Sequence, residues 1–313
     1  MSKNPQALTG QWNGISFDAN KTFLGTDSNY ISGSVLSHAI ISNASRSVIL
    51  SKGTSLLIDE VDIRYCSFGV YLNESGYNTI RNSIFTYCDF GIFIASGYRN
   101  PENKIYGNTI YGCSDVGIFI NSNAQYSYDN YIYNNTLKAC SIGLHIGNYS
   151  NNGEANNVIS HNVFISNKDA IKLFHKSNTI SNNYFVLNRN GIICWQSDYN
   201  TITRNLFSRN KLHSIILAAG SSFNSVTYNN LNYSSGGVNI TADSSRMSLY
   251  NSFLYNTLFQ NSDWSFQIGN TPQGAVQFNN LINNGEFRSF LNQSDSLVHG
   301  EYNFWGTVVE SAI

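Results

Sequence analysis

Hydrophobic residues recur along this chain in short runs in which apolar and polar positions alternate. In residues 178–195, NTISNNYFVLNRNGIICW, the apolar positions are Ile180, Phe185, Ile192 and Cys194. Alternation with a period of two over short runs predicts β-strands and not helices. The Asn and Gly residues between the runs are typical of corners with a left-handed backbone.

The same polar positions return at a regular interval. One Asn recurs at Asn82, Asn108, Asn135, Asn162, Asn183, Asn205, Asn229, Asn256 and Asn284, at intervals of 26, 27, 27, 21, 22, 24, 27 and 28 residues. A second Asn stands five residues earlier, at Asn103, Asn130, Asn157, Asn178, Asn200, Asn224, Asn251 and Asn279. Only the first unit breaks this spacing, with Tyr77 in place and Asn78 beside it. A period in the twenties predicts a solenoid.

Short strands without helices between them cannot form a βαβ fold, so the chain must coil with each rung paired in parallel to the next, ~4.8 Å away. We therefore predict an all-β fold, a single right-handed parallel β-helix of about eleven rungs with aromatic-rich ends. One domain spans residues 1–313, with an N-terminal cap and weak rungs over about 1–76, regular repeats over about 77–284, and a C-terminal cap over about 285–313. Trp12 and residues 301–306 are expected to close the two ends, and the recurrent Asn side chains to stack as a hydrogen-bonded ladder.

A Gly-Ile element recurs once per rung. It occurs as Gly14-Ile15, Gly69-Val70, Gly91-Ile92, Gly117-Ile118, Gly143-Leu144, Gly191-Ile192 and Gly237-Val238. The pattern resembles the right-handed parallel β-helix repeat family, which includes pectate-lyase-like enzymes, tailspikes, epimerases and NosD-like periplasmic proteins. The resemblance covers nearly the whole chain. It implies the fold, but not one activity, because this fold carries many.

Composition narrows the classes of partner and location. Charged residues are 12 % of the chain and the net charge is −1, which disfavours nucleic acid as a partner. No apolar run approaches the ~18–20 residues of a membrane span. Residues 1–12 have no apolar signal core, which fits a chain that stays in its cell, a trimmed chain or a piece of a longer one. The composition favours an extracellular or cell-surface protein.

Four of the five cysteines, Cys66, Cys88, Cys113 and Cys140, lie just before the Gly-Ile element of successive rungs. They are expected to stack as a ladder that Asn167, Asn188 and Asn210 continue. Buried reduced thiols are favoured over disulfides or a metal site, because the ladder has no CxxC or Cys/His metal spacing. Cys194 is expected in the core. We expect no metal and no cofactor.

The residue after Ile in the Gly-Ile strand should point outward. Down the axis these residues are Tyr71, Phe93, Phe119, His145, Lys172, Ile193, Ile216, Asn239 and Gln267, and Trp195 would extend the row. An exposed aromatic row that leads into His and Lys is typical of a platform for sugar rings. The candidate ligand-binding residues are therefore Tyr71, Phe93, Phe119, His145, Lys172 and Trp195. Long loops at 95–102, 121–129 and 147–156 would form one wall of a groove. Alternatively, these loops or another subunit cover the row.

Catalytic candidates are few, and none is assigned. Asp89 and Asp115 occupy matching places on consecutive rungs, ~5 Å apart, a separation that suits paired carboxylates in glycoside hydrolysis. His145 and Lys172 could act as a base and an electrostatic stabiliser in a lyase or epimerase. Asp59, Glu60 and Asp62, with Arg64 nearby, form a second acidic group. No acidic calcium cluster and no Met/His-rich copper tract is evident.

The sequence favours a non-enzymatic surface β-helix protein, either a structural or assembly protein or a glycan-binding module that uses the aromatic row. One alternative is a polysaccharide-acting enzyme, a lyase, glycoside hydrolase or epimerase. Another is a viral or phage tailspike-like receptor-binding protein. The expected partners are a polysaccharide or glycan, other protein chains or further copies of this chain.

Overall fold

The computed structural model describes residues 12–18, 23–24, 30–51, 53–95, 101–121, 127–148, 153–241, 246–269, 274–284, 290–293 and 298–306. The chain forms two compact units, residues 1–158 and 159–313. Every described element is a β-strand, so no helix that could span a membrane occurs in this part of the chain. Apart from one short antiparallel pair, β2 (Phe23–Leu24) and β3 (Tyr30–Ser32), the strands belong to three parallel sheets. The predicted all-β parallel β-helix is confirmed.

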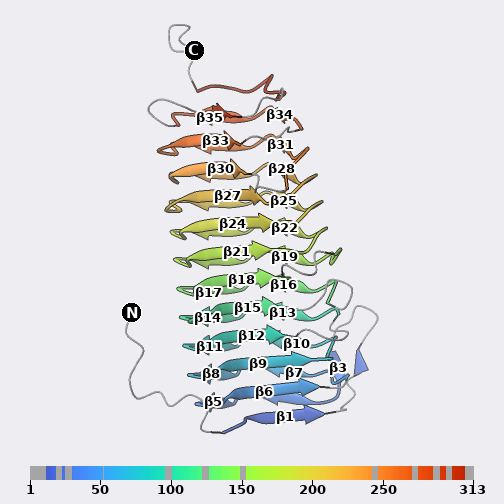
Figure 1. Cartoon of the computed structure of the whole chain (residues 1–313). Coiled ribbons are helices and arrows are strands. Elements are labelled where there is room, and N and C mark those ends of the chain that lie inside the picture. The colour runs from blue at the N-terminus through green and yellow to red at the C-terminus, as the bar shows by residue number, and fades with distance from the viewer. Residues whose placement is uncertain are drawn as a thin grey trace. The chain divides into compact units, whose positions relative to one another are not determined.

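Sheet 1 contains the longest strands. In the first unit they are β1 (Ile15–Asp18), β6 (Arg46–Ser51), β9 (Phe68–Asn73), β12 (Phe90–Ile94), β15 (Val116–Ile120) and β18 (Ile142–Ile146). In the second unit they are β21 (Asp169–Leu173), β24 (Asn190–Trp195), β27 (His213–Ala218), β30 (Gly236–Ile240), β33 (Trp264–Ile268) and β36 (Phe290–Asn292). Figure 1 shows β6, β9, β12 and β15 as successive parallel arrows.

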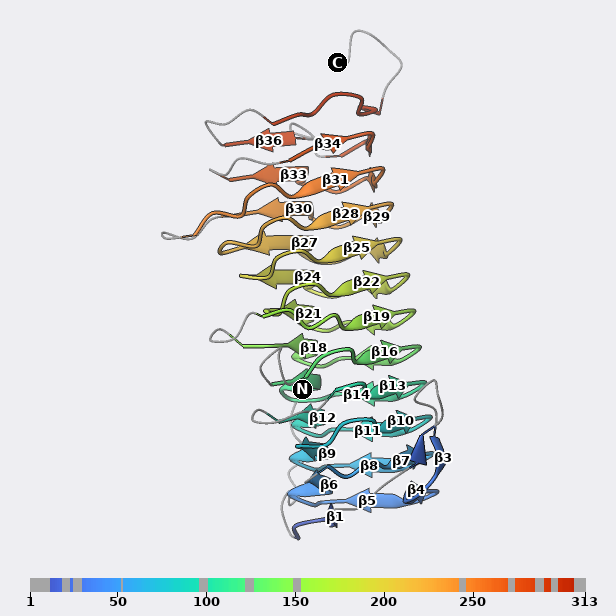
Figure 2. The ribbon, with the colours of Figure 1, turned by 90° about the vertical axis from the view of Figure 1, so that its right-hand side faces the viewer.

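Sheet 2 consists of short strands. In the first unit they are β4 (Val35–Ser37), β7 (Leu57–Asp59), β10 (Thr79–Arg81), β13 (Lys104–Tyr106) and β16 (Tyr131–Tyr133). β19 (Val158–Ser160) contains the unit boundary. The second unit has β22 (Thr179–Ser181), β25 (Thr201–Thr203), β28 (Ser225–Thr227), β31 (Ser252–Leu254) and β34 (Val276–Gln277). Figure 2 shows β22, β25, β28 and β31 in succession.

Sheet 3 is built in the same way. The first unit contributes β5 (Ile40–Ser42), β8 (Asp62–Arg64), β11 (Ile84–Thr86), β14 (Thr109–Tyr111) and β17 (Thr136–Lys138). The second contributes β20 (Val163–Ile165), β23 (Tyr184–Val186), β26 (Leu206–Ser208), β29 (Asn230–Asn232), β32 (Thr257–Phe259) and β35 (Asn280–Ile282). The chain passes from sheet 2 through a corner to sheet 3, and through a second corner to sheet 1.

The middle residue of each short strand points into the core. Phe164, Phe185 and Phe207 are fully buried on neighbouring strands of sheet 3 and stack with centroid distances of 5.0 and 4.6 Å. Cys194 is likewise fully buried, in register with Leu173 and Leu217. In most short strands this alternation buries the middle, apolar residue while both strand neighbours face outward, as the period of two predicted; in β7 and β10 the first residue is buried as well.

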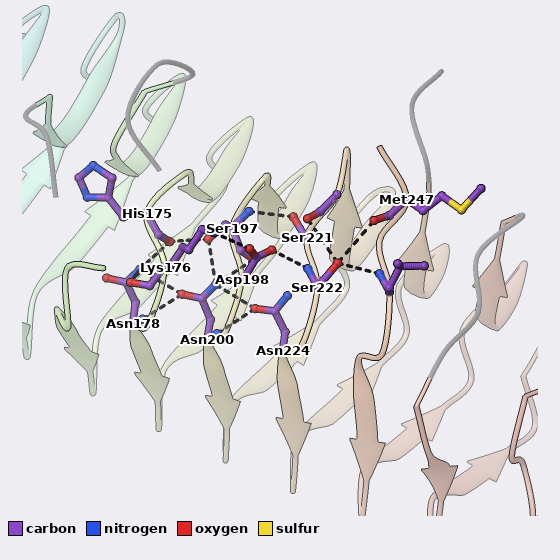
Figure 3. Close-up of polar contacts among 12 residues, drawn as sticks. His175, Lys176, Asn178, Ser197, Asp198, Asn200, Ser221, Ser222, Asn224 and Met247 are labelled. Atoms are coloured by element: carbon purple, nitrogen blue, oxygen red, sulfur yellow. Dashed lines mark hydrogen bonds and ion pairs between the residues drawn. The ribbon is translucent and has the colours of Figure 1, made fainter. Parts of the chain in front are cut away.

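Buried Asn side chains link the corners of successive rungs. Figure 3 shows one such ladder in the second unit, in which Asn178 bonds Asn200, and Asn200 bonds Asn224. Each Oδ1 accepts both the backbone N–H and the side-chain Nδ2–H of the preceding Asn, at 2.9–3.0 Å. These bonds satisfy polar groups that the corners would otherwise bury without partners. The predicted Asn ladder is confirmed.

Three ladders run through the rungs, with their residues five positions apart in the sequence. At the first and last regular rungs, the ladder residues differ from those that the repeat spacing predicted. In the first unit the ladder residues are Asn78 and Ser83, since their N–H groups bond the side chains of Asn103 and Asn108; Asn82 lies beside the ladder. Near the other end, Asn279 continues the ladder of Asn256, and Asn284 continues that of Asn261. The rung there begins five residues earlier than the count implied.

The cysteines occupy the third ladder, just before sheet 1. In the second unit Asn167, Asn188 and Asn210 fill this position, as predicted, with Asn167 N–H bonded to Asn188 Oδ1 at 2.9 Å and Asn188 N–H bonded to Asn210 Oδ1 at 3.1 Å. In the first unit Cys66, Cys88, Cys113 and Cys140 are buried and reduced. A hydrogen bond from the thiol of Cys88 lowers the pKa of Cys66 to about 6, whereas the same contact and burial raise the pKa of Cys88.

Candidate functional site: an aromatic surface on the first unit

The outward row predicted for the first unit is present on sheet 1. Tyr71 is in register with Phe93, Phe93 with Phe119, and Phe119 with His145. All four side chains are half-buried, whereas the residues on either side of them in each strand point into the core. Sheet 1 therefore holds these four rings in one continuous row on β9, β12, β15 and β18.

Two further rings widen this row. Phe68 and Phe90 lie three residues before Tyr71 and Phe93, stack on each other at 5.0 Å, and contact the row edge to face. Counting only the residue after Ile missed them, although each directly precedes the Gly of its rung. We call Phe68, Tyr71, Phe90, Phe93, Phe119 and His145 the aromatic surface.

The rings pack in an ordered pattern. Tyr71 and Phe93 are stacked at 5.4 Å, Phe93 and Phe119 are perpendicular at 5.4 Å, and Phe119 stacks on His145 at 4.4 Å. Offset stacks and edge-to-face pairs each contribute about 0.5–1.5 kcal/mol beyond area burial. The aromatic surface is therefore preorganised, so that the binding of a ligand would not have to order these protein side chains.

A cationic group lies at one end of the aromatic surface. The guanidinium of Arg46, on β6, lies 4.5 Å from the ring centroid of Tyr71 and 5.8 Å from that of Phe68. Arg46 is exposed and is in register with Phe68. The surface thus combines apolar ring area with one positive charge and, at the other end, an imidazole.

Two carboxylates lie at the edge of this surface, one residue before Phe90 and Val116. Asp115 N–H bonds the backbone oxygen of Asp89 at 3.1 Å, so the predicted match of the two corners is confirmed for the backbone. Asp89 accepts a hydrogen bond from the hydroxyl of Ser114. Partial burial and the negative charge of Asp89 raise the pKa of Asp115. A raised pKa is one property that a carboxyl needs to act as a proton donor.

Lys172 and Trp195 belong to the second unit. Lys172 is in register with Ile193, as predicted, and its ammonium forms an ion pair of 3.0 Å with Asp169. Asp169 is buried and also accepts a hydrogen bond from Asn190 at 2.8 Å. Trp195 is in register with Ala218 and is half-buried. The geometry therefore assigns Lys172 a structural contact within its own unit.

Parts of the loops expected as a groove wall lie outside the described residues, namely 96–100, 122–126 and 149–152. The second acidic group is engaged in ion pairs. Asp59 bonds Arg81 at 2.7 Å, which lowers the pKa of Asp59, and Asp62 bonds Arg64. In the described part of the chain no three His, Cys, Asp or Glu side chains lie close enough together to hold a metal ion.

Two family models match the chain. The model described as "Right handed beta helix region" matches residues 13–185, and the model described as "Periplasmic copper-binding protein (NosD)" matches residues 114–280. Each match covers more than half of the chain, and the chain therefore belongs to the right-handed β-helix family and to the NosD family. The second description names copper, but among the described residues no three His, Cys, Asp or Glu side chains lie close enough together to bind a metal ion. No curated protein matches.

Several solved structures share the fold. A lacto-N-biosidase from Eubacterium ramulus has a TM-score of 0.60 and 12 % identity, over 87 % of this chain and 60 % of that one. This chain thus spans under two thirds of that protein. A mannuronan C-5 epimerase A-module from Azotobacter vinelandii has a TM-score of 0.56 and 14 % identity, over 86 % of this chain and 80 % of that one. An alginate lyase in complex with a trisaccharide has a TM-score of 0.55 and 12 % identity, over 97 % of this chain and 82 % of that one. With sequence identities of only 12–14 %, these similarities show a common fold and nothing further.

Proposed function

We propose that this chain is a β-helix module that binds a polysaccharide on the aromatic surface of its first unit. The observation that carries the proposal is the continuous, half-exposed set of six rings on four neighbouring strands, with Arg46 at one end. Aromatic rings bind the C–H faces of sugars, and charged or amide groups beside them bind hydroxyls or carboxylates. The structural neighbours named above include proteins that act on saccharides, which supports this partner class. A polysaccharide partner fits a protein that works outside the cell, at its surface or in the periplasm.

Binding is tested by affinity electrophoresis in gels that contain alginate or pectate. We expect Phe119→Ala and Phe93→Ala to weaken binding by ~10-fold or more each, the loss typical of a central aromatic anchor. Ile84→Ala is the matched control, because Ile84 is 44 % exposed on sheet 3 of the same unit and lies apart from the aromatic surface. Binding that survives both Phe substitutions, or that Ile84→Ala weakens equally, would exclude the aromatic surface as the binding site.

The main competing function is a covered or assembly surface, for which light scattering is the measurement. If the wild-type chain is an oligomer that Phe119→Ala dissociates, and no polysaccharide retards it, the rings form a protein interface. A monomer that polysaccharide retards supports the proposal.

A second candidate function is polysaccharide cleavage or epimerisation beside the same rings. It is favoured by the raised pKa of Asp115 next to Asp89, since a protonated carboxyl can serve as a general acid. Such activity would be present at low pH and lost as the pH rises through the pKa of Asp115. Asp115→Asn and Asp89→Asn should abolish new reducing ends or unsaturated products but leave binding in place. A chain that binds without product over the acidic range is a binding module only.

A further inference from the structure

A second set of aromatic rings lies in the second unit, at the corner between sheets 2 and 3. These rings belong to the residues directly before ladder Asn residues, namely Tyr228, Tyr255, Phe278 and Tyr302. Their successive centroids are 5.1, 5.2 and 5.2 Å apart, with interplanar angles of 9°, 15° and 5°. We call these four residues the corner stack.

The corner stack is considerably exposed. The exposed fractions of its residues are 55, 46, 42 and 75 % in chain order. The ring faces of Tyr255 and Phe278 lie against neighbouring rings on both sides, so these two residues expose their ring edges, and Tyr302, at the end of the stack, is the most exposed. A ring edge carries partial positive charge, and a phenol donates and accepts hydrogen bonds. The corner stack therefore repeats ring C–H groups about every 5 Å, the spacing of its strands, and its three Tyr residues add a phenol hydroxyl each.

Hydroxyl side chains lie beside the corner stack on sheet 2. The outward residues of β25, β28 and β31 include Thr201, Thr203, Ser225, Thr227 and Ser252, which we call the hydroxyl strip. Thr227 Oγ1 donates to Thr203 Oγ1 at 3.1 Å. None of these three described strands, with sequences TIT, SVT and SFL, contains a charged residue, but Arg204 directly follows Thr203 and its guanidinium lies 5.8 Å from the ring centroid of Tyr228.

A further row of stacked rings lies at the opposite end of the same strands, formed by Tyr199, Phe223 and Tyr250. Next to Tyr199, the carboxylate of Asp198 is paired with Lys176 at 2.7 Å and accepts the Ser222 N–H at 2.8 Å (Figure 3). The ammonium of Lys176 thus balances the negative charge of Asp198. The hydroxyl strip, between two aromatic rows, offers uncharged hydrogen-bonding side chains.

Backbone geometry does not demand aromatic residues at these corners. Tyr228, Tyr255, Phe278 and Tyr302 have φ between 56° and 62°, a left-handed conformation that favours Gly and Asn and disfavours bulky residues. Left-handed backbone costs about 1–2 kcal/mol for such residues, and one stacked pair returns about 0.5–1.5 kcal/mol. Stacking thus offsets part or all of the cost of the left-handed backbone at these positions.

We propose that the corner stack and the hydroxyl strip form a site for an uncharged polysaccharide chain. Protein–protein interfaces have an apolar core and a polar rim, whereas this face has hydroxyls in the centre and rings at its borders. An extended glycan offers both hydroxyls and C–H groups in a regular repeat. The three strands of the hydroxyl strip carry no charged side chain, so the hydrogen bonds that they offer suit a neutral polymer. This site lies in the other unit from the aromatic surface and does not depend on it.

The test compares two polymers with one backbone, hydroxyethyl cellulose and carboxymethyl cellulose, in affinity electrophoresis. We expect hydroxyethyl cellulose to retard the wild-type chain and the double variant Tyr228→Asn/Tyr255→Asn to lose ~10-fold or more in apparent affinity, as for a central anchor. Asn suits a left-handed corner, so the substitutions should leave the fold intact, which circular dichroism checks. The double variant Tyr228→Phe/Tyr255→Phe retains the rings and should retain most of the binding.

Leu187→Asn is the matched control, since Leu187 lies in the same unit at a left-handed corner, with φ of 57° and 45 % exposure. Phe93→Ala should not change this binding, which separates the site from the aromatic surface of the first unit. The proposal is overturned if hydroxyethyl cellulose, glucomannan and xyloglucan all fail to retard the wild-type chain, or if the double Asn variant binds as well as Leu187→Asn. A wild-type dimer that the double Asn variant dissociates would identify a second copy of this chain as the occupant and would also overturn it.

Discussion

Each corner of the rungs contains two adjacent residues with different roles, one that turns the backbone and one that forms hydrogen bonds to the next rung. The first adopts a left-handed backbone, as Asn182 and Arg204 do with φ of 55° and 54°, and turns the chain. The second, such as Asn183 or Asn205, buries its amide and bonds the next rung. Bond formation therefore falls to the residue that does not carry the strained φ. The turning position is free to accept Ser, Tyr, Arg or Leu.

At the scale of one residue, Asn205→Ala should cost several kcal/mol of unfolding free energy. Asn205 Oδ1 accepts the N–H of Asn183 at 2.9 Å, and its Nδ2 donates to the Ile180 carbonyl at 2.9 Å and to Asn229 at 3.0 Å. Each buried group left without a partner costs about 1–3 kcal/mol. Urea unfolding measures the loss. Asn230→Ala, at an exposed position on β29, should change stability by less than ~0.5 kcal/mol. Equal losses in the two variants would contradict the role of the ladder.

At the scale of the strand, close contacts disfavour a side chain directly before Val70 and Ile92 in sheet 1. A Cβ at Gly91 would lie 2.5 Å from the carbonyl oxygen of Gly117, and one at Gly69 would lie 2.3 Å from that of Gly91. Real Cβ atoms essentially never show such a distance, so the backbones of β9, β12 and β15 would have to shift to accommodate a side chain there. The recurrent Gly-Ile element thus reflects contact between neighbouring strands.

Gly91→Ala should accordingly lower the unfolding free energy by about 1–3 kcal/mol, as overpacked sites do. The midpoint of urea denaturation is the measurement. Gly300→Ala serves as its control, because the nearest atom to the added methyl would be Asn303 Nδ2, 4.0 Å away. A Gly91→Ala chain as stable as the control would mean that the strands separate without cost.

The sequence predicted the strands and the row Tyr71–Phe93–Phe119–His145, because the distance from Gly to the outward residue is constant within each rung. It missed Phe68 and Phe90 because the outward residues here are three apart, whereas a regular strand alternates in steps of two. The corner stack was also missed, since Tyr and Phe are poor predictors of left-handed backbone. The error at Asn82 arose because Ser83 fills a ladder position by offering its hydroxyl in place of an amide.

At the scale of the whole molecule, the two units present different outward residues on sheet 1. The first unit has the aromatic surface, and the second has Lys172, Asn239 and Gln267 among aliphatic neighbours. The inward residues are alike in both. A common interior therefore carries two unlike exteriors, as expected when each rung satisfies its neighbours and leaves the outside free to vary.

Since rungs interact only with adjacent rungs, removal of one whole rung should be tolerated. Deletion of residues 200–223 would join Tyr199 to Asn224, so that Asn224 takes the ladder place of Asn200 beside Asn178. We expect a β-sheet spectrum and a cooperative thermal transition, with a lower midpoint. Deletion of residues 200–224 removes one residue more, takes away the ladder Asn and shifts the next strand by one position, which exchanges its inward and outward faces. Similar melting of the two deletions would contradict rung-by-rung stacking.

The Asn ladders also determine how this protein should age chemically. Hydrolysis of a side-chain amide turns Asn into Asp, which keeps an acceptor but loses the Nδ2 donor and gains a charge. On an exposed residue such as Asn230 the change is harmless, but within a ladder it would place a carboxylate against the carbonyl that Asn205 now bonds. Slow deamidation at a single buried position would thus act as a break between two rungs, and the storage lifetime of the fold would follow the slow chemistry of its amides.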